Sequence, residues 1–173
     1  MWDSKEKRTK VFLLLSTAKS IHQEDYWIYM NRAGKIIYIG IDPGIETGFA
    51  VWNKQQKQFW SIKTLKIHQA FAQIHELYRD ILKKEQIFVR VEDARKRKWF
   101  GGNADQKKFG AGAIKIQCTI WEEFLTDMKI DFEMVAPIKN GTKWKDDYFK
   151  RVTGWPHQTS NHSRDAAALV FQM

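Results

Sequence analysis

Four residues that could carry metal and acid–base chemistry occupy regular places in the pattern of strands and helices. Asp42 ends the apolar run IIYIGI and precedes a Pro-Gly turn, and Glu92 ends the apolar run IFVRV. Asp165 falls in the first turn of a predicted C-terminal helix, three residues after His162. Residues three apart share a helix face, so His162 and Asp165 would point the same way. If the strands that end in Asp42 and Glu92 are neighbours, all four side chains meet beyond the strand ends.

A cluster of three carboxylates needs a cation, because the negative charges repel one another. Carboxylate oxygens with one imidazole suit Mg²⁺ or Mn²⁺. Two such ions, about 3.5 to 4 Å apart, can drive in-line displacement at a phosphodiester. One ion activates the attacking water, and the other stabilises the leaving oxygen. The four residues therefore predict a metal-dependent phosphodiester hydrolase.

Each of these residues also has a purely structural explanation. Asp42-Pro43-Gly44 is an ordinary turn sequence, and Glu92 could mark the place where a strand meets solvent. Asp165 would be favoured near a helix N-terminus by the helix dipole alone. A single histidine such as His162 is more often a surface or capping residue than a ligand. It is the joint placement of the four residues that favours a site.

The elements that must position these residues follow an α/β pattern from Lys35 onward. Alternating or continuous apolar runs predict strands at 36–41, 47–52, 57–65, 87–92 and 131–137. Apolar residues at helical spacing, with their end signals, predict helices at 67–85, 107–128 and 142–154, and from Asn161 to the C-terminus. Three strands that can form a meander, followed by alternating helices and strands, predict a mixed five-stranded α/β sheet with helices on both faces.

Residues 1–34 differ from the rest of the chain. They lack strand alternation and end in the turn-like sequence NRAG, just before the first clear strand. We therefore predict an N-terminal extension at 1–34, distinct from the core, and one domain at 35–173.

The composition is that of a basic globular protein. Of 173 residues, 43% are hydrophobic, and 29 Lys and Arg against 20 Asp and Glu give a net charge of +9. This excess favours nucleic acid as the partner over a membrane surface, since no long basic amphipathic helix stands out. The only cysteine, Cys118, excludes an internal disulfide and fits a reducing compartment. The apolar run VFLLL is too short to cross a bilayer.

A basic loop follows the strand that ends in Glu92. Residues 93–115 contain seven basic and two acidic residues, with aromatic residues and a pair of glycines. Lysine and arginine contact phosphates, and aromatic rings stack on unpaired bases, so we predict that this loop binds DNA. The alternative is a solvated loop whose aromatic rings enter the core. The candidate DNA-binding residues are Arg95, Lys96, Arg97, Lys98, Trp99, Phe100, Lys107 and Lys108.

Four segments in this order, IGIDPGIETGFAV, VRVED, GAGAIKIQ and HSRDAAALV, resemble the RuvC-like Holliday junction resolvases. The segment TGWPHQTSNHSRDAA is similar to the short resolvase-like proteins of phages and prophages. The resemblance covers residues 35–173. It implies a ribonuclease H-like fold, crossover junction endodeoxyribonuclease activity in DNA recombination and repair, and a cytoplasmic place in a bacterial or phage-infected cell.

The resemblance also implies roles for the four residues. Asp42, Glu92 and Asp165 match the metal-binding acids of the family, and His162 falls where members carry aspartate or histidine. The implied cofactor is Mg²⁺, as two ions, with Mn²⁺ as a substitute. The implied partners are branched DNA and a second copy of the chain, with helix 107–128 near the dimer interface, and no membrane.

Two nearby acids are not expected to bind metal. Asp93 follows Glu92 directly and would point to the opposite face of a strand. Glu46 lies in the turn after Asp42 and is expected to be a solvated turn residue.

Three other functions stay open at this point. A nuclease of the same fold could act on flaps, forks or RNA. A non-catalytic nucleic-acid-binding module is disfavoured, because binding a polyanion gives no reason to cluster carboxylates. A sugar-kinase-like ATPase also begins with an aspartate–glycine strand turn, but this chain is too short for two such domains and lacks a second phosphate-binding glycine loop.

Overall fold

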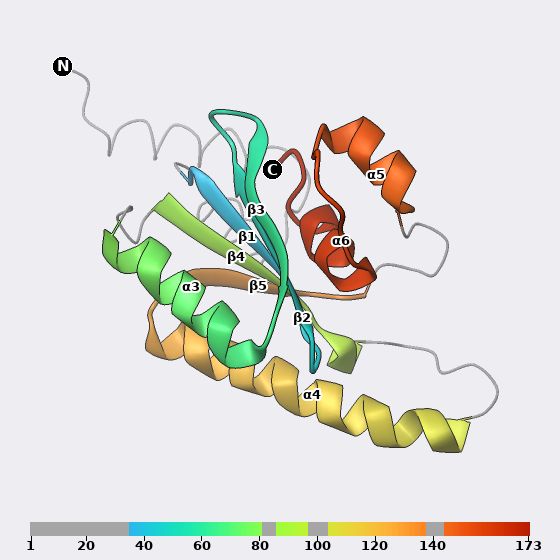
Figure 1. The fold of residues 1–173 in the computed structure, drawn as a ribbon. Coiled ribbons are helices and arrows are strands. Elements are labelled where there is room, and N and C mark those ends of the chain that lie inside the picture. Colours follow the sequence, from blue (N-terminus) through green and yellow to red (C-terminus); the bar gives the residue numbers. More distant parts are fainter. Residues whose placement is uncertain (1–34, 81–85, 97–103, 138–143) are drawn as a thin grey trace, which may run out of the picture. The chain divides into compact units, whose positions relative to one another are not determined.

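Five apolar segments pair into one sheet in the computed structural model, which describes residues 35–80, 86–96, 104–137 and 144–173 (Figure 1). The strands are β1 (Ile37–Asp42), β2 (Thr47–Asn53), β3 (Gln58–Leu65), β4 (Ile87–Glu92) and β5 (Asp131–Val135). They lie in the order β3-β2-β1-β4-β5. β2 is antiparallel to β1 and β3, whereas β4 is parallel to β1 and β5. The predicted mixed five-stranded sheet is confirmed.

Helices cover both faces of this sheet, as the sequence predicts. α3 and α4 lie on one face, and α5 and α6 on the other (Figure 1). Their bounds, with the short 3₁₀ helix η2, are α3 (Ile67–Asp80), η2 (Ala94–Lys96), α4 (Ala104–Asp127), α5 (Asp146–Thr153) and α6 (Asn161–Ala168). Among the helices of the described residues, none combines the length and apolar character needed to cross a membrane.

The alternation of side chains along the strands builds two separate cores. Ile37, Ile39 and Ile41 of β1 pack with α3 and α4, around the fully buried Trp121 of α4. Tyr38, one residue out of phase, packs beneath α6 on the other face. Because strand side chains alternate between faces, Asp42 shares the face of Tyr38 and therefore the side of α6.

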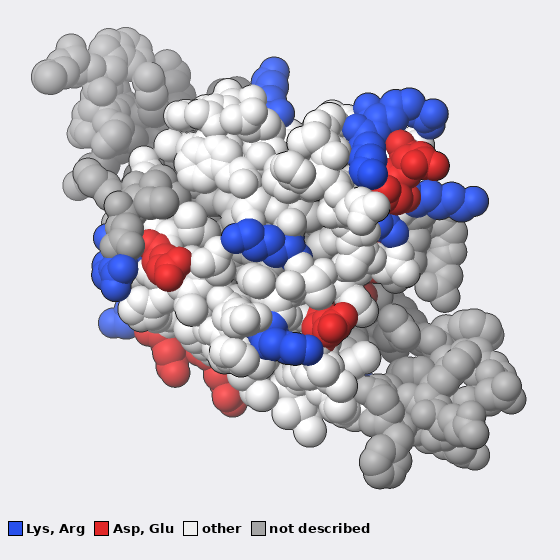
Figure 2. Space-filling model, viewed as in Figure 1, with Lys and Arg blue, Asp and Glu red and all other residues white. Residues whose placement is uncertain are grey.

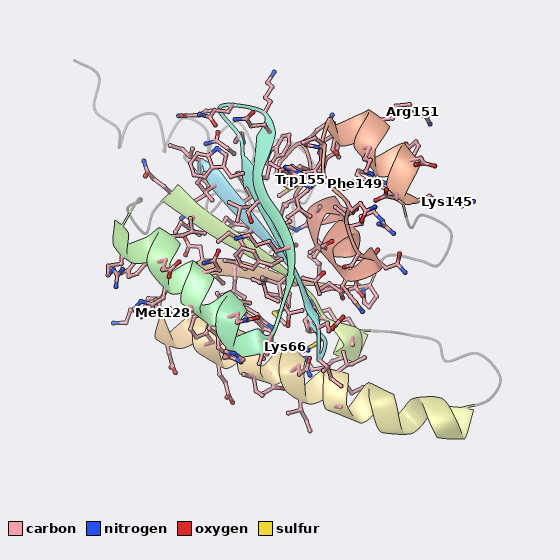
Figure 3. All side chains as sticks on the ribbon, in the orientation of Figure 1. Lys66, Met128, Lys145, Phe149, Arg151 and Trp155 are labelled. Atoms are coloured by element: carbon pink, nitrogen blue, oxygen red, sulfur yellow. The ribbon has the colours of Figure 1, made fainter. Side chains whose placement is uncertain are left out.

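Aromatic residues fill the core beneath α5 and α6. Phe149 is fully buried and, with Trp155, lies between α5, α6 and the sheet (Figure 3). Trp144 packs against the same cluster, and Phe59 of β3 lies 6.3 Å from Phe149 between ring centroids. Trp144, Phe149 and Trp155 of the C-terminal region thus serve packing.

Two predicted helix starts differ from the structure by several residues. The helix predicted at 107–128 begins at Ala104, because residues 104–106 join the helix rather than the preceding loop. The helix predicted at 142–154 begins at Asp146, where two acids in the first turn favour the positive end of the helix dipole. It ends at Thr153, and the predicted glycine at its end, Gly154, caps it with a left-handed φ of 69°.

The last helix does not run to the C-terminus, contrary to prediction. α6 ends at Ala168. The amides of Leu169 and Val170 bond to carbonyls three residues back, at 3.2 Å each, so the helix tightens into turns. The end of the helix predicted at 67–85 and the N-terminal extension predicted at 1–34 lie outside the described residues.

Candidate active site

The ends of β1 and β4 bring two of the predicted acids to one edge of the sheet. β1 and β4 are parallel neighbours whose last paired residues are Ile41 and Val91. Asp42 and Glu92 follow these residues, and neighbouring strands lie about 4.8 Å apart. Phe88 packs beneath α6, so Glu92, four residues later, faces the same side as Asp42. Both carboxylates therefore belong to the α6 face at the same edge.

His162 lies directly beside Asp42. Its Nδ1 is 2.8 Å from Oδ2 of Asp42. The Asp42 side chain is 12% exposed, whereas that of His162 is 50% exposed. The imidazole thus joins a nearly buried carboxylate to solvent.

Two glycines allow α6 to approach the sheet this closely. A methyl group at Gly48 of β2 would collide with the backbone carbonyl of His162, and one at Gly40 of β1 would collide with that of Ala166. Gly48 is also the strand partner of Asp42. The absence of a side chain at Gly48 therefore lets the first turn of α6 sit over the end of β1 and sets the contact between His162 and Asp42.

The register of α6 over the sheet places Asp165 toward β4. Arg90 of β4 donates from Nη1 to the carbonyl of Leu169, at 2.7 Å. Asp165 lies one helical turn before Leu169, about 6 Å along the axis. Glu92 lies two residues after Arg90, about 6.6 Å along the strand in the matching direction. The backbone of Asp165 is therefore at about the level of Glu92 along β4, and the approach of its side chain to the two strand acids stays a prediction.

The start of α6 is held by hydroxyl groups. Ser160 caps the helix, and it forms a capping box with Ser163. The hydroxyl of Ser160 also lies 2.5 Å from that of Thr64 on β3. The sequence offers the cap as a signal, a serine just before the helix, but it does not show the partner on β3.

Arg164 fixes α6 against α5. Its guanidinium donates to the carbonyls of Trp144 and Thr159 at 3.0 and 2.6 Å, and to Asp146 at 3.2 Å. The hydrogen bonds of Asp146 with Lys150 and Thr159 hold its pKa below the ordinary value. The helix that carries His162 and Asp165 is thus anchored from a second side.

The donor set at this edge fits Mg²⁺ or Mn²⁺, since it combines carboxylate oxygens with one imidazole. Among the residues that the structure describes, no three His, Cys, Asp or Glu side chains are arranged closely enough to hold a metal ion. Metal binding by Asp42, Glu92, Asp165 and His162 therefore stays a prediction.

The residues after β4 form an ion-pair network. Arg95 donates to both carboxylate oxygens of Asp93, at 2.8 and 2.9 Å, and its Nη1 lies 2.7 Å from a carboxylate oxygen of Glu122 on α4. Asp93 is 2% exposed. Burial would raise the pKa of Asp93, but the hydrogen bonds and charge of Arg95 hold it below the ordinary value of 3.8. Asp93 thus connects the end of β4 to α4.

The predicted DNA-binding residues fall into three groups. Arg95 is held by Asp93 and Glu122, and Lys96 donates to the carbonyl of Met134 at 2.5 Å. Lys107 and Lys108 lie in α4. Outside the described residues lie Arg97, Lys98, Trp99 and Phe100. DNA contact by any of these groups stays a prediction.

Glu46 is a solvated turn residue, as expected. Its side chain is 61% exposed and lies 3.7 Å from Lys66.

Comparison with known proteins gives a structural likeness but no match in sequence. No protein-family model and no curated protein sequence matches the chain. Among solved structures, a crystal structure of Fowlpox virus resolvase with its substrate Holliday junction DNA is similar over 76% of this chain and 83% of that one. The identity is 12% and the TM-score is 0.36. A likeness this loose does not carry an assignment of activity, which has to rest on the residues of the chain itself.

Proposed function

We propose that the domain is a metal-dependent endonuclease that resolves four-way DNA junctions. The observation that supports this most strongly is the placement of Asp42 and Glu92. They end adjacent parallel strands, on the face covered by the helix that carries His162 and Asp165. Two acids that end neighbouring strands, with a histidine beside one of them, are suited to a cation site, because carboxylates brought together without a cation repel one another.

In this proposal Asp42, Glu92 and Asp165 hold two Mg²⁺ ions, and His162 either completes one metal site or handles a proton. The bound ions would supply an activated water and a stabilised leaving oxygen at the phosphodiester. The strand ends fix the positions of the two strand acids, and the contact of His162 with Asp42 orients the imidazole. The exposed side of His162 can exchange a proton with the solvent. Water adds to phosphorus, the bond to the 3′ oxygen breaks, and the products carry a 5′ phosphate and a 3′ hydroxyl.

The surface that would hold DNA is proposed at the sheet edge after β4. On the face shown in Figure 2, basic side chains of the described residues are scattered rather than gathered into one patch. On α5, for example, Lys150 pairs with Asp146 at 2.8 Å. The net charge of +9 supports binding of a polyanion, and the basic segment after β4 is adjacent to Glu92 in the sequence.

A homodimer would present two such sites to the two strands of a junction that must be cut. The isoleucines of α4 support this part of the proposal, since Ile114, Ile116 and Ile120 are 37%, 63% and 38% exposed. α4 also extends beyond the sheet (Figure 1). Ile116 and Ile120 are four residues apart and share one face of the helix, and exposed apolar residues on one face are suited to contact with another protein surface.

The test compares a labelled four-way junction with a linear duplex of the same arm sequence, each with Mg²⁺ or with EDTA. The proposal predicts paired, Mg²⁺-dependent cuts in the junction and little cutting of the duplex. Equal or faster cutting of flaps, forks or RNA would identify a nuclease of different selectivity. Binding of the junction without cutting would identify a non-catalytic module.

A further inference from the structure

The turn between β1 and β2 exposes a large apolar side chain beside the candidate active site. Ile45 is 79% exposed and is the most exposed large hydrophobic residue in the described part of the chain. Its neighbours in the turn, Pro43 and Gly44, are buried, and Thr47 is fully buried. A single exposed apolar residue is ordinary on a protein surface, so its position has to carry the argument.

The turn that carries Ile45 is held in one conformation. The hydroxyl of Thr47 donates to the carbonyl of Gly44 at 3.1 Å. A methyl group at Gly44 would lie 2.9 Å from the carbonyl oxygen of Glu46, so the backbone folds tightly on itself. Glu46 in turn lies 3.7 Å from Lys66, which lies where β3 leads into α3 (Figure 3). The turn that exposes Ile45 is thus stabilised by a hydrogen bond within it and by the ion pair of Glu46 with Lys66.

The chain also fixes how far Ile45 lies from the acids. Ile45 is three positions after Asp42, so the two Cα atoms are at most about 11 Å apart. Successive nucleotides in a DNA strand rise about 3.4 Å. A strand whose phosphodiester reaches Asp42 therefore has bases within about three steps of Ile45.

We propose that Ile45 is a wedge that inserts between bases next to the cut, and this inference rests on the proposed nuclease function. Apolar side chains such as isoleucine can enter a base step where they unstack the bases. Stacking is already interrupted at a branch point, so insertion there costs less than in a continuous duplex. The wedge would make the affinity higher for branched DNA than for a linear duplex. Contacts of lysine and arginine with phosphates do not distinguish these two DNA structures.

The test uses the full chain carrying Asp42→Asn, which binds without cutting, and junctions with 2-aminopurine at the branch point. Fluorescence of this base rises when it unstacks. We expect a rise on binding of the Asp42→Asn chain, and none when Ile45→Ser is added. We also expect Ile45→Ser to weaken junction binding about tenfold, while affinity for the linear duplex stays within about twofold. The matched control is Val152→Ser, a change at a residue of α5 that is 38% exposed.

Three results would overturn the wedge. Unchanged fluorescence and affinity in Ile45→Ser, with cutting intact in the otherwise unaltered chain, would reject the wedge and leave the nuclease proposal standing. An equal loss of affinity for the junction and the duplex in Ile45→Ser would show that Ile45 contacts DNA of either structure instead. If no junction binds at all, both proposals fail. Unstacking that depends on Ile45 in a chain that never cuts, even with Asp42 restored, would support the wedge and reject the nuclease.

Discussion

Replacement of Gly48 by alanine should displace the first turn of α6 from the sheet and break the contact between His162 and Asp42. Gly48 lies in β2, opposite Asp42. A methyl group there would collide with the backbone carbonyl of His162 and would lie 3.1 Å from Cβ of Asp42. A backbone carbonyl cannot rotate away as a flexible side chain can, so the first turn of α6 must move.

The size of the effect follows from the cost of overpacking. Forcing one extra methyl group into a filled site costs about 1–3 kcal/mol. For a chain of this length each kcal/mol lowers the melting temperature by roughly 2–4 °C, so Gly48→Ala should melt about 2–12 °C lower. Displacement of His162 by about 1 Å should also reduce the cleavage rate, by up to about a hundredfold.

The matched control is Gly112→Ala. Gly112 lies in α4, and a methyl group there would have no neighbour within 4 Å. Alanine favours the helix over glycine by about 0.8–1 kcal/mol, so this change should raise the melting temperature by a few degrees. Both substitutions add one methyl group, and they are expected to change the melting temperature in opposite directions.

Thermal unfolding followed by circular dichroism measures both variants, and junction cleavage under single-turnover conditions measures the rate. If Gly48→Ala melts and cuts like the unchanged chain, then α6 does not sit on β2 as described. The inferred positioning of His162 would fail with it.

The other predictions concern the ion pairs and the core. Arg95→Ala should destabilise the fold by roughly 2–3 kcal/mol, seen as a lower urea midpoint, because it leaves the buried Asp93 unpaired; an unchanged midpoint would show that the pair is dispensable. The folded pKa of Asp93 is lowered, so its stabilisation is present above about pH 4 and is lost as the pH falls through that lowered pKa. Urea midpoints measured from pH 7 to pH 2 should therefore fall less steeply below pH 4 in Asp93→Asn, and identical slopes would reject this. Phe149→Ala should cost about 3–5 kcal/mol, whereas Tyr148→Ala, at a neighbour that is 44% exposed, should cost under about 0.5 kcal/mol by the same assay; similar losses would contradict the assigned core.

The strands and the sheet could be predicted from the sequence because their apolar patterns are local. The run ending in Asp42 is apolar on both faces, and the structure buries all six residues of β1. β4 shows the same kind of pattern, and its last residue is Glu92. The position of each acid at a strand end is therefore a property of the sequence itself.

Helix ends were predicted less well, because they depend on the tertiary surroundings. α6 begins at the predicted Asn161 but ends at Ala168, and Arg90 of β4 donates a hydrogen bond to the carbonyl of the next residue, Leu169. Gly154 could be predicted as a helix end, since a glycine there provides the left-handed conformation locally.

The contacts that fix the candidate site join residues far apart in the chain, and no local pattern reveals them. His162 and Asp42 are 120 positions apart, and Thr64 and Ser160 are 96 apart. In the sequence Arg95 looks like a DNA contact, but the structure pairs it with Asp93 and Glu122. In the sequence Gly48 looks like an ordinary strand residue, and its role is visible only in the structure, where α6 packs directly against it.

The most direct test of the account is cleavage of a labelled four-way junction by single amide variants of the three acids. We expect Mg²⁺-dependent cuts by the unchanged chain and rates lower by at least about a hundredfold for Asp42→Asn, Glu92→Gln and Asp165→Asn. Glu123→Gln, at an exposed acid of α4, should cut normally. Cleavage that survives Asp42→Asn, or that persists in EDTA, would contradict the account.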